Sequence, residues 1–236
     1  MKRLFLITLG ILLLASSTNL LAGDKAGEVI DDSVYHDFTY DFTIKVADGW
    51  EVARIKDADD IYRVTISKVS PVMPVKYNEN PHLFTYPKLT VMADTTTVSL
   101  DSLETLLSAR EGKVDIVKQA IKDFGLLTYS KYRPEFEPSV TIKYKDFEGL
   151  ILPARKQMDI SDYRRGTIYF LQNDEITLII EAVAELERFS FNDRAFGDMV
   201  RSIRVGREEP KEEEAVEIIQ EEEVEGEEDK KNEEKE

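Results

Sequence analysis

Apolar and polar residues alternate along much of the first half of this chain, which is the pattern of half-buried β-strands. The alternation over 37–46 predicts one strand with its apolar side chains on a single face: Phe38, Tyr40, Phe42, Ile44 and Val46. A turn is predicted at 48–49, and a return strand begins at Trp50. Further strands are expected over 61–69 and 88–95, so this half predicts an antiparallel sheet of local hairpins.

The period of the pattern changes to that of a helix after residue 99. Ser99 is a suitable N-cap, and the stripe that follows advances in steps of three and four, with Arg110 occupying one place among its apolar residues: Leu103, Leu107, Val114, Val117, Ile121 and Phe124. With Gly125 as its end, this pattern predicts an amphipathic helix of roughly 20–25 residues. A second helical stripe over 195–203 follows the segment 190–193, which resembles a capping box.

Strand patterns also occur between the two helices. They cover 140–144, 150–158, 166–172 and 176–184, and the last two form a clear hairpin across 173–175. No internal repeat and no linker rich in glycine or serine divides this part of the chain. One α+β domain is therefore predicted.

The segment Phe42-Thr-Ile-Lys-Val-Ala-Asp-Gly49-Trp50 resembles the opening motif F-x-I-x-x-P-x-G-W of the PsbP-like superfamily. That group includes the photosystem PsbP proteins, the Ran-binding Mog family and bacterial DcrB-like domains. A central helix, a strand led by Gly149 and Ala154, and a closing helix follow in the family's order. Over about residues 38–205, the resemblance implies an antiparallel sheet with helices on both faces, an α-β-α sandwich.

The chain departs from the PsbP-like pattern at two places. Ala47-Asp48 stands where the family usually has proline, and residues 70–87 look like an insertion. The resemblance implies no particular activity, because one fold hosts unrelated functions.

Residues 1–22 have the organisation of a secretory signal peptide. Two basic residues precede an apolar run over 4–15, which is shorter than the roughly 20 residues that a membrane span needs. Cleavage is expected after Ser17 or, preferably, after Ala22. The expected product is secreted, periplasmic or extracellular, and has no integral membrane span. An uncleaved N-terminal anchor is the alternative interpretation.

Composition divides the rest of the chain into three parts. Residues 23–36 are expected to be a flexible lead-in, and 37–205 to be the single α+β domain. The segment 206–236 carries sixteen acidic residues against five basic ones and has few large apolar side chains. Low hydrophobicity with high like charge predicts an acidic disordered tail, and a docking segment or a weak cation-collecting segment is the alternative.

Few residues of the chain carry recognisable chemistry. The absence of cysteine excludes disulfides, thiolate metal sites and a cysteine nucleophile. His36 and His82 are isolated from other metal-ligand types, and the acidic residues at 57–60 are interpreted as a turn. No nucleotide-binding or hydrolase motif occurs, so no catalytic residue, metal or cofactor is predicted. The net charge of −16 argues against nucleic acid as a partner.

The segment Pro71–Pro87 stands apart, because its four prolines prevent it from joining a central strand. It also contains residue types that are enriched in binding surfaces, which makes these the candidate partner-binding residues: Met73, Tyr77, Phe84 and Tyr86. The alternative is that the segment folds back and covers one end of the core.

Two classes of function follow from the sequence. The first is a secreted, non-enzymatic interaction or accessory protein that binds an envelope or secreted protein. The second is a carboxylate-dependent hydrolase or carbohydrate-binding domain that acts on an envelope polymer, for which paired carboxylates in a cleft would be evidence. A carrier of an apolar ligand is a third hypothesis. The sequence specifies neither the partner nor the oligomeric state.

Overall fold

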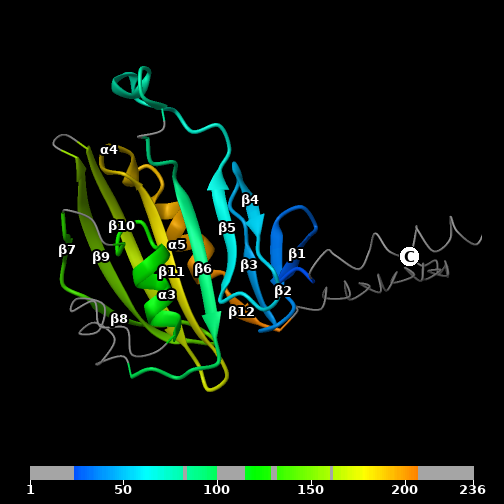
Figure 1. Cartoon of the computed structure of the whole chain (residues 1–236). Coiled ribbons are helices and arrows are strands. Elements are labelled where there is room, and N and C mark those ends of the chain that lie inside the picture. Colours follow the sequence, from blue (N-terminus) through cyan, green and yellow to red (C-terminus); the bar gives the residue numbers. More distant parts are fainter. Residues whose placement is uncertain (1–23, 82–83, 100–114, 129–131, 160–161, 207–236) are drawn as a thin grey trace, which may run out of the picture.

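The described part of the chain folds into two antiparallel sheets of unequal size (Figure 1). The computed structural model describes five segments: residues 24–81, 84–99, 115–128, 132–159 and 162–206. The eight-stranded sheet has this strand order: β4 (Trp50–Ile55), β5 (Tyr62–Lys68), β6 (Lys88–Asp94), β11 (Thr177–Glu185), β10 (Asp162–Gln172), β9 (Glu148–Asp159) and β7 (Pro134–Phe136). The short strand β8 (Val140–Lys143) also pairs with β9.

The hairpin formed by β10 and β11 lies near the middle of the large sheet and confirms the sequence prediction. Its register runs without a break from Arg164 opposite Glu185 to Gln172 opposite Thr177. The side chain of Asn173 stabilises the turn, because its Oδ1 accepts hydrogen bonds from the backbone N–H groups of Glu175 and Ile176. Neighbouring strands pair locally, as the alternating pattern indicated.

The small sheet contains a correction to the sequence analysis. Its strands lie in the order β1 (Gly27–Ile30), β2 (Val34–Asp37), β3 (Phe42–Lys45) and β12 (Arg204–Val205). The prediction of a flexible lead-in over 23–36 is therefore wrong for the part that the structure describes. The strands stay ordered because Tyr35 is fully buried and β2 pairs with β3.

The predicted continuous strand over 37–46 is also wrong. A turn separates β2 from β3, and Asp41 within it has a left-handed φ of 47°. Phe38 lies in this turn and is 54% exposed, whereas Phe42 and Ile44 are buried. A local alternation of apolar residues cannot distinguish one strand from two strands joined by a tight turn.

Trp50 follows the turn at Asp48-Gly49, where the glycine has a φ of +76°. The turn was predicted, but it does not close a hairpin, since β3 belongs to the small sheet and β4 to the large one. The Trp50 ring packs edge-to-face on Phe196 with centroids 5.1 Å apart. The Gly49-Trp50 pair thus lies where the two sheets and the last helix meet.

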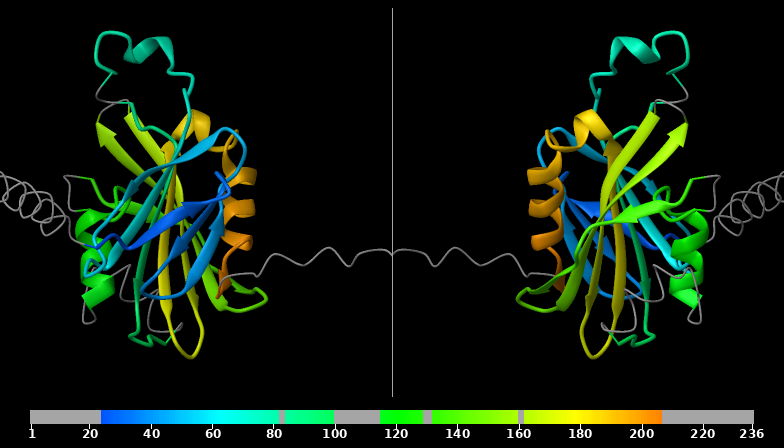
Figure 2. Two further views of the ribbon diagram at one scale, coloured as in Figure 1. Left: turned by 90° about the vertical axis from the view of Figure 1, so that its right-hand side faces the viewer. Right: turned by 90° about the vertical axis from the view of Figure 1, so that its left-hand side faces the viewer.

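Apolar side chains on the two faces of the large sheet form two cores. On β11, Leu178, Ile180 and Ala182 point into the core that also receives the small sheet and α5 (Asp193–Arg201). Ile179 and Val183 point into the opposite core, which is covered by α3 (Asp115–Asp123). The helices therefore lie on opposite faces of the sheet (Figure 2). This arrangement is the predicted α+β sandwich.

The two helix predictions differ in how far the structure tests them. The first half of the predicted 99–125 helix falls at 100–114, outside the described residues, and its second half is α3. The predicted capping box at Ser190 is wrong, because α4 (Leu186–Phe189) precedes it and the N-cap of α5 is Asn192. Asn192 makes no side-chain cap hydrogen bond, since its amide instead contacts Arg188 and Lys68.

A buried polar cluster fastens the end of α3 to the sheet. Glu181 is 1% exposed and accepts hydrogen bonds from the backbone N–H groups of Gly125 and Leu126. Lys156 is equally buried and donates to the backbone carbonyls of Gly125 and Thr128. Two buried side chains of opposite charge thus hold the segment after α3 through its backbone.

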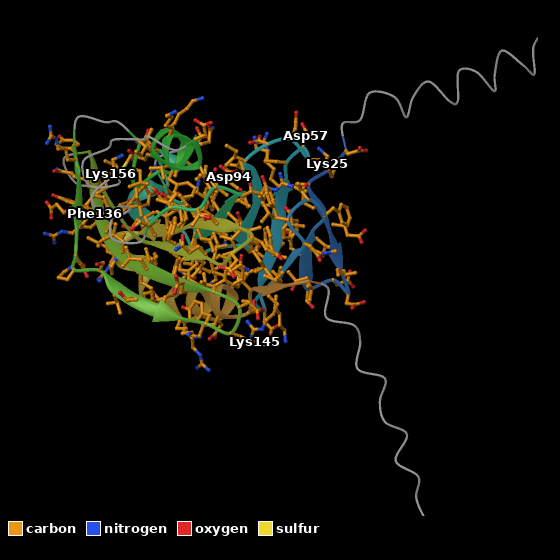
Figure 3. The ribbon with its side chains drawn as sticks, turned by 90° about the horizontal axis from the view of Figure 1, so that it is seen from below. Lys25, Asp57, Asp94, Phe136, Lys145 and Lys156 are labelled. Carbon is orange, nitrogen blue, oxygen red and sulfur yellow. The ribbon has the colours of Figure 1, made fainter. Side chains whose placement is uncertain are left out.

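The N-terminal end of the described chain is held by an ion pair. Lys25 Nζ lies 3.0 Å from Asp57 Oδ1, and the two residues also form an isolated β-bridge (Figure 3). Residues 1–22 and 207–236 lie outside the described residues, so the signal peptide and the acidic tail stay predictions.

Candidate functional site

The segment between β5 and β6 is a chain of tight turns that projects from one end of the large sheet (Figure 1). Its short 3₁₀ helix η1 (Val75–Tyr77) follows Pro74, whose carbonyl accepts the backbone N–H of Tyr77. At its base, the N–H of Lys68 donates to the carbonyl of Pro87. The prolines fix local φ angles, so the backbone of the segment stays ordered although it does not pair with the sheet.

The aromatic residues of this segment form a column that stabilises it from within. The Tyr77 and Phe84 rings are each 4% exposed and have centroids 5.4 Å apart. Tyr86 packs edge-to-face on Phe84 at 5.0 Å and is 50% exposed. Of the four candidate partner-binding residues, Tyr77 and Phe84 are thus buried and Tyr86 is accessible. Met73 is half-buried.

Two polar contacts tie the segment to the far end of β11 and the turn before α5. Lys76 Nζ lies 2.8 Å from Oε1 of Glu185, a residue that is 1% exposed. Lys68 Nζ donates to Asn192 Oδ1 at 2.8 Å. The segment is therefore anchored at both its tip and its base.

An open pocket of about 230 Å³ lies where this segment meets α4 and the turn before α5. We call it the loop pocket and define it by its lining residues: Lys68, Ser70, Pro71, Val72, Phe84, Pro87, Arg188, Phe191 and Asn192. Val72 and Phe191 are each 72% exposed, although both are large apolar side chains. Phe84 forms a buried floor, so the pocket combines an ordered base with accessible apolar walls.

The electrostatic character of the loop pocket is positive. Lys68 and Arg188 line it, and no carboxylate is among its described lining residues. The Arg188 guanidinium lies over the Phe191 ring, 5.8 Å from its centroid. Arg188 Nε is buried and has no hydrogen-bond partner within the described segments. The pocket is therefore suited to an apolar group that is accompanied by negative charge.

Sequence reasoning identified the proline-rich segment but missed the other wall of the pocket. Arg188 and Phe191 are more than a hundred positions away in the sequence, on the connection between β11 and α5. The available signal was Phe191 itself, an aromatic residue that falls outside the apolar stripe of the last helix. Val72 gives no such signal, because valine is also common in buried strands.

A second hollow of about 430 Å³ runs beside α5, on the sheet face opposite α3. We call it the α5 groove. Two carboxylates, Glu137 and Asp193, are among its lining residues, together with Tyr144 and Tyr169. Burial raises the pKa of both tyrosines above its ordinary value. Arg165 lies 3.3 Å from Glu137 and neutralises its charge.

The described residues contain no group of three or more histidine, cysteine, aspartate or glutamate side chains placed to hold a metal ion. His36 lies on β2, where its Nε2 is 2.9 Å from Asp41 Oδ1. His82 falls outside the described residues. Within the described segments, no helix combines the length and apolar character needed to cross a bilayer.

Comparisons with known proteins give similarity at the level of structure only. No protein-family model matches the sequence, and no curated protein sequence matches it. Twenty-one chains of solved structures do match. One is cyanobacterial PsbP (CyanoP) from Synechocystis sp. PCC 6803, with 12% identity and a TM-score of 0.46 over 76% of this chain and 96% of that one.

Two other matches are bacterial proteins. LpqN of Mycobacterium tuberculosis, described as involved in cell envelope biogenesis, has 9% identity and a TM-score of 0.47 over 78% of this chain and 90% of that one. A Pseudomonas aeruginosa protein of unknown function has 10% identity and a TM-score of 0.40 over 78% and 99%.

Proposed function

We propose that this protein is a secreted, non-enzymatic binding protein of the cell envelope, and that the loop pocket receives an apolar side chain of a partner protein. The observation that carries the proposal is the exposure of Val72 and Phe191 beside a pocket with a buried aromatic floor. Exposed large apolar side chains grouped around a hollow are typical of interaction surfaces rather than of solvated ones.

The loop pocket is held in place before any partner binds, so binding should cost little conformational entropy. Prolines, the buried Tyr77–Phe84 contact and the Lys76–Glu185 ion pair hold the segment before a partner arrives. A preorganised surface loses less conformational entropy on association, so more of the contact energy is available as affinity. The positive rim also favours a partner segment that carries acidic residues.

Site-specific photocrosslinking tests this proposal. A photoreactive amino acid at Val72 should capture one defined protein in the envelope of the source cells, whereas the same group at Phe38 should not. Phe38 is a matched control, because it is also exposed but lies in the turn between β2 and β3. Equal capture from both positions would contradict the proposal.

The captured protein then allows a quantitative test with purified components. Replacing Val72 and Phe191 by serine should weaken binding by about tenfold or more, because truncation of central apolar contacts commonly has effects of this size. Phe38→Ser should leave the dissociation constant unchanged. Calorimetry measures both, and unchanged affinity in the double variant would overturn the assignment of the pocket.

A carbohydrate-binding or hydrolytic function is the second candidate, and the α5 groove is the observation that favours it. Glu137 and Asp193 provide carboxylates and Tyr144 an aromatic surface, which are common components of polysaccharide sites. The test is binding or cleavage of an envelope polysaccharide. If Asp193→Asn abolishes it and Val72→Ser does not, the function belongs to the α5 groove and not to the loop pocket.

A further inference from the structure

The acidic C-terminal segment contains one short apolar stretch, Ala215-Val-Glu-Ile-Ile219. Three glutamates precede it at 212–214 and three follow it at 221–223. Its aliphatic side chains are thus concentrated in five residues and surrounded by negative charge. A surface that accommodates this stretch must offer apolar contact and cations together.

The loop pocket has both properties. Val72, Phe191 and the Phe84 floor supply apolar contact, and Lys68 and Arg188 supply positive charge. The buried Nε of Arg188 lacks an acceptor within the described part of the chain, so an arriving carboxylate would give this guanidinium a counter-charge.

Charge distinguishes the loop pocket from other hollows of the molecule. The α5 groove has three arginines among its lining residues, but it also has the carboxylates of Glu137 and Asp193. Its arginines already have acidic partners, since Arg165 pairs with Glu137, and Arg194 and Arg201 pair with Asp198. The hollow next to the 57–60 turn is lined by three aspartates and by no cation within the described residues. An acidic segment is repelled by these carboxylates, whereas the rim of the loop pocket attracts it.

The length of chain beyond Gly206 is sufficient to reach the pocket. Asn192 lines the pocket and immediately precedes α5, so Gly206 can be at most about 31 Å away along the helix and the five residues after it. The nine steps from Gly206 to Ala215 span up to about 32 Å when extended. The stretch 215–219 can therefore meet the pocket on its own molecule.

We propose that residues 215–219 occupy the loop pocket of the same chain, with their aliphatic side chains against Val72 and Phe191 and the flanking glutamates near Lys68 and Arg188. The tether makes docking intramolecular, so it does not depend on protein concentration and no loss of translational freedom between two molecules opposes it. The segment thereby shields the apolar walls from water. Its docking does not depend on the existence of a partner protein, although it would compete with one.

Paramagnetic relaxation measured by NMR on the full chain tests the proposal, and the absence of native cysteine makes labelling specific. A nitroxide attached to Gln220→Cys lies next to the apolar stretch without altering it. The amide signals of Val72, Phe191 and Asn192 should lose most of their intensity. The matched control is a nitroxide at Lys235→Cys, which should leave these signals strong.

Two further samples make the outcome decisive. Replacing Val216, Ile218 and Ile219 by serine in the Gln220→Cys chain keeps every charge, and should restore the three signals. Mixing isotope-labelled chain with unlabelled, nitroxide-bearing chain should leave them unchanged. Equal effects from the two label positions, no recovery in the serine variant, or broadening in the mixed sample, which would show docking on a second copy, would each overturn the proposal.

Discussion

Arg63 on β5 and Asp37 at the end of β2 form an ion pair in which both side chains are fully buried. Arg63 Nε lies 2.8 Å from Asp37 Oδ2, and Nη2 lies 3.2 Å from Oδ1. Asp37 also accepts the Tyr35 hydroxyl and the backbone N–H groups of Thr39 and Tyr40. Because β2 and β5 belong to different sheets, this pair fastens the small sheet to the large one.

Replacing Arg63 by methionine should destabilise the protein strongly. The Asp37 carboxylate would stay buried without its counter-charge, and such losses lower the free energy of unfolding by about 3–5 kcal/mol. Urea unfolding followed by circular dichroism measures the change. The control is Lys25→Ala in the exposed Lys25–Asp57 pair, for which a loss below about 1 kcal/mol is expected. Similar losses in both variants would contradict a special role for the buried pair.

Phe84 and Phe191 both line the loop pocket, but only the replacement of Phe84 by serine should lower stability strongly. Phe84 is 4% exposed, so Phe84→Ser should cost about 3 kcal/mol and open the 70–87 segment to proteolysis. Phe191 is 72% exposed, and Phe191→Ser should change stability by less than about 0.5 kcal/mol. Thermal unfolding and limited proteolysis distinguish the two; an unfolded Phe191→Ser variant would show that this ring is part of the core.

The contribution of Glu181 to the free energy of unfolding should decrease as the pH rises. Burial raises the pKa of this carboxyl above its ordinary value of 4.5, although hydrogen bonds from Leu126 and Gly125 and the nearby cations oppose the change. The folded state therefore binds this proton more tightly than the unfolded state. Its stabilising contribution is complete below pH 4.5 and is lost as the pH rises through the raised pKa.

The Glu181→Gln variant isolates this effect. The free energy of unfolding of the native chain, minus that of the variant, should decrease between pH 4.5 and neutrality. Each unit of pKa difference corresponds to about 1.4 kcal/mol. Glu135→Gln, at an exposed position, controls for the chemical change itself. A difference that is constant or increases with pH would contradict a raised pKa of Glu181 in the folded state.

Alanine at Gly166 and at Gly49 should destabilise the protein for different reasons. A Cβ at Gly166 would lie 2.4 Å from the Ala182 carbonyl oxygen and 2.5 Å from Leu126 Cδ1, so a cost of about 1–3 kcal/mol is expected from overpacking. A Cβ at Gly49 meets nothing within 4 Å, but its φ of +76° costs about 1–2 kcal/mol.

Asparagine at the same two positions separates these causes. Asparagine tolerates the left-handed region, so Gly49→Asn should recover part of the stability lost in Gly49→Ala. Gly166→Asn should be worse than Gly166→Ala, because the larger side chain meets the same backbone oxygen. If Gly166→Asn were more stable than Gly166→Ala, the neighbouring strand would be able to move away from residue 166. Denaturant midpoints provide the measurement.

Much of the secondary structure could be predicted from the sequence, because neighbouring residues decide it. The strand at 50–55, the hairpin of β10 and β11 and the stripe of α5 each depend on apolar spacing or on a turn signal within a few positions. Where two strands shared one alternating pattern, as at β2 and β3, the same reasoning failed. The turn at Asp41 preserves the alternation while reversing the chain.

The division into two sheets depended on contacts between distant parts of the chain. The N-terminal residues looked like a polar lead-in, yet Tyr35 and Asp37 are buried because Arg63 and the β3 strand meet them. Pairing between strands and the burial of a charged pair arise only after the chain has folded, since neither has a local signal.

The candidate site, too, could be predicted from the sequence only in part. The sequence by itself determined that 71–87 is rich in proline and aromatic residues, and that a short apolar stretch stands within an acidic C-terminal segment. Only the tertiary structure decided that Tyr77 and Phe84 turn inward, and that Val72 is left exposed beside Phe191 from the other end of the chain. Composition sets which contacts are favourable, but exposure depends on which distant elements arrive to cover each side chain.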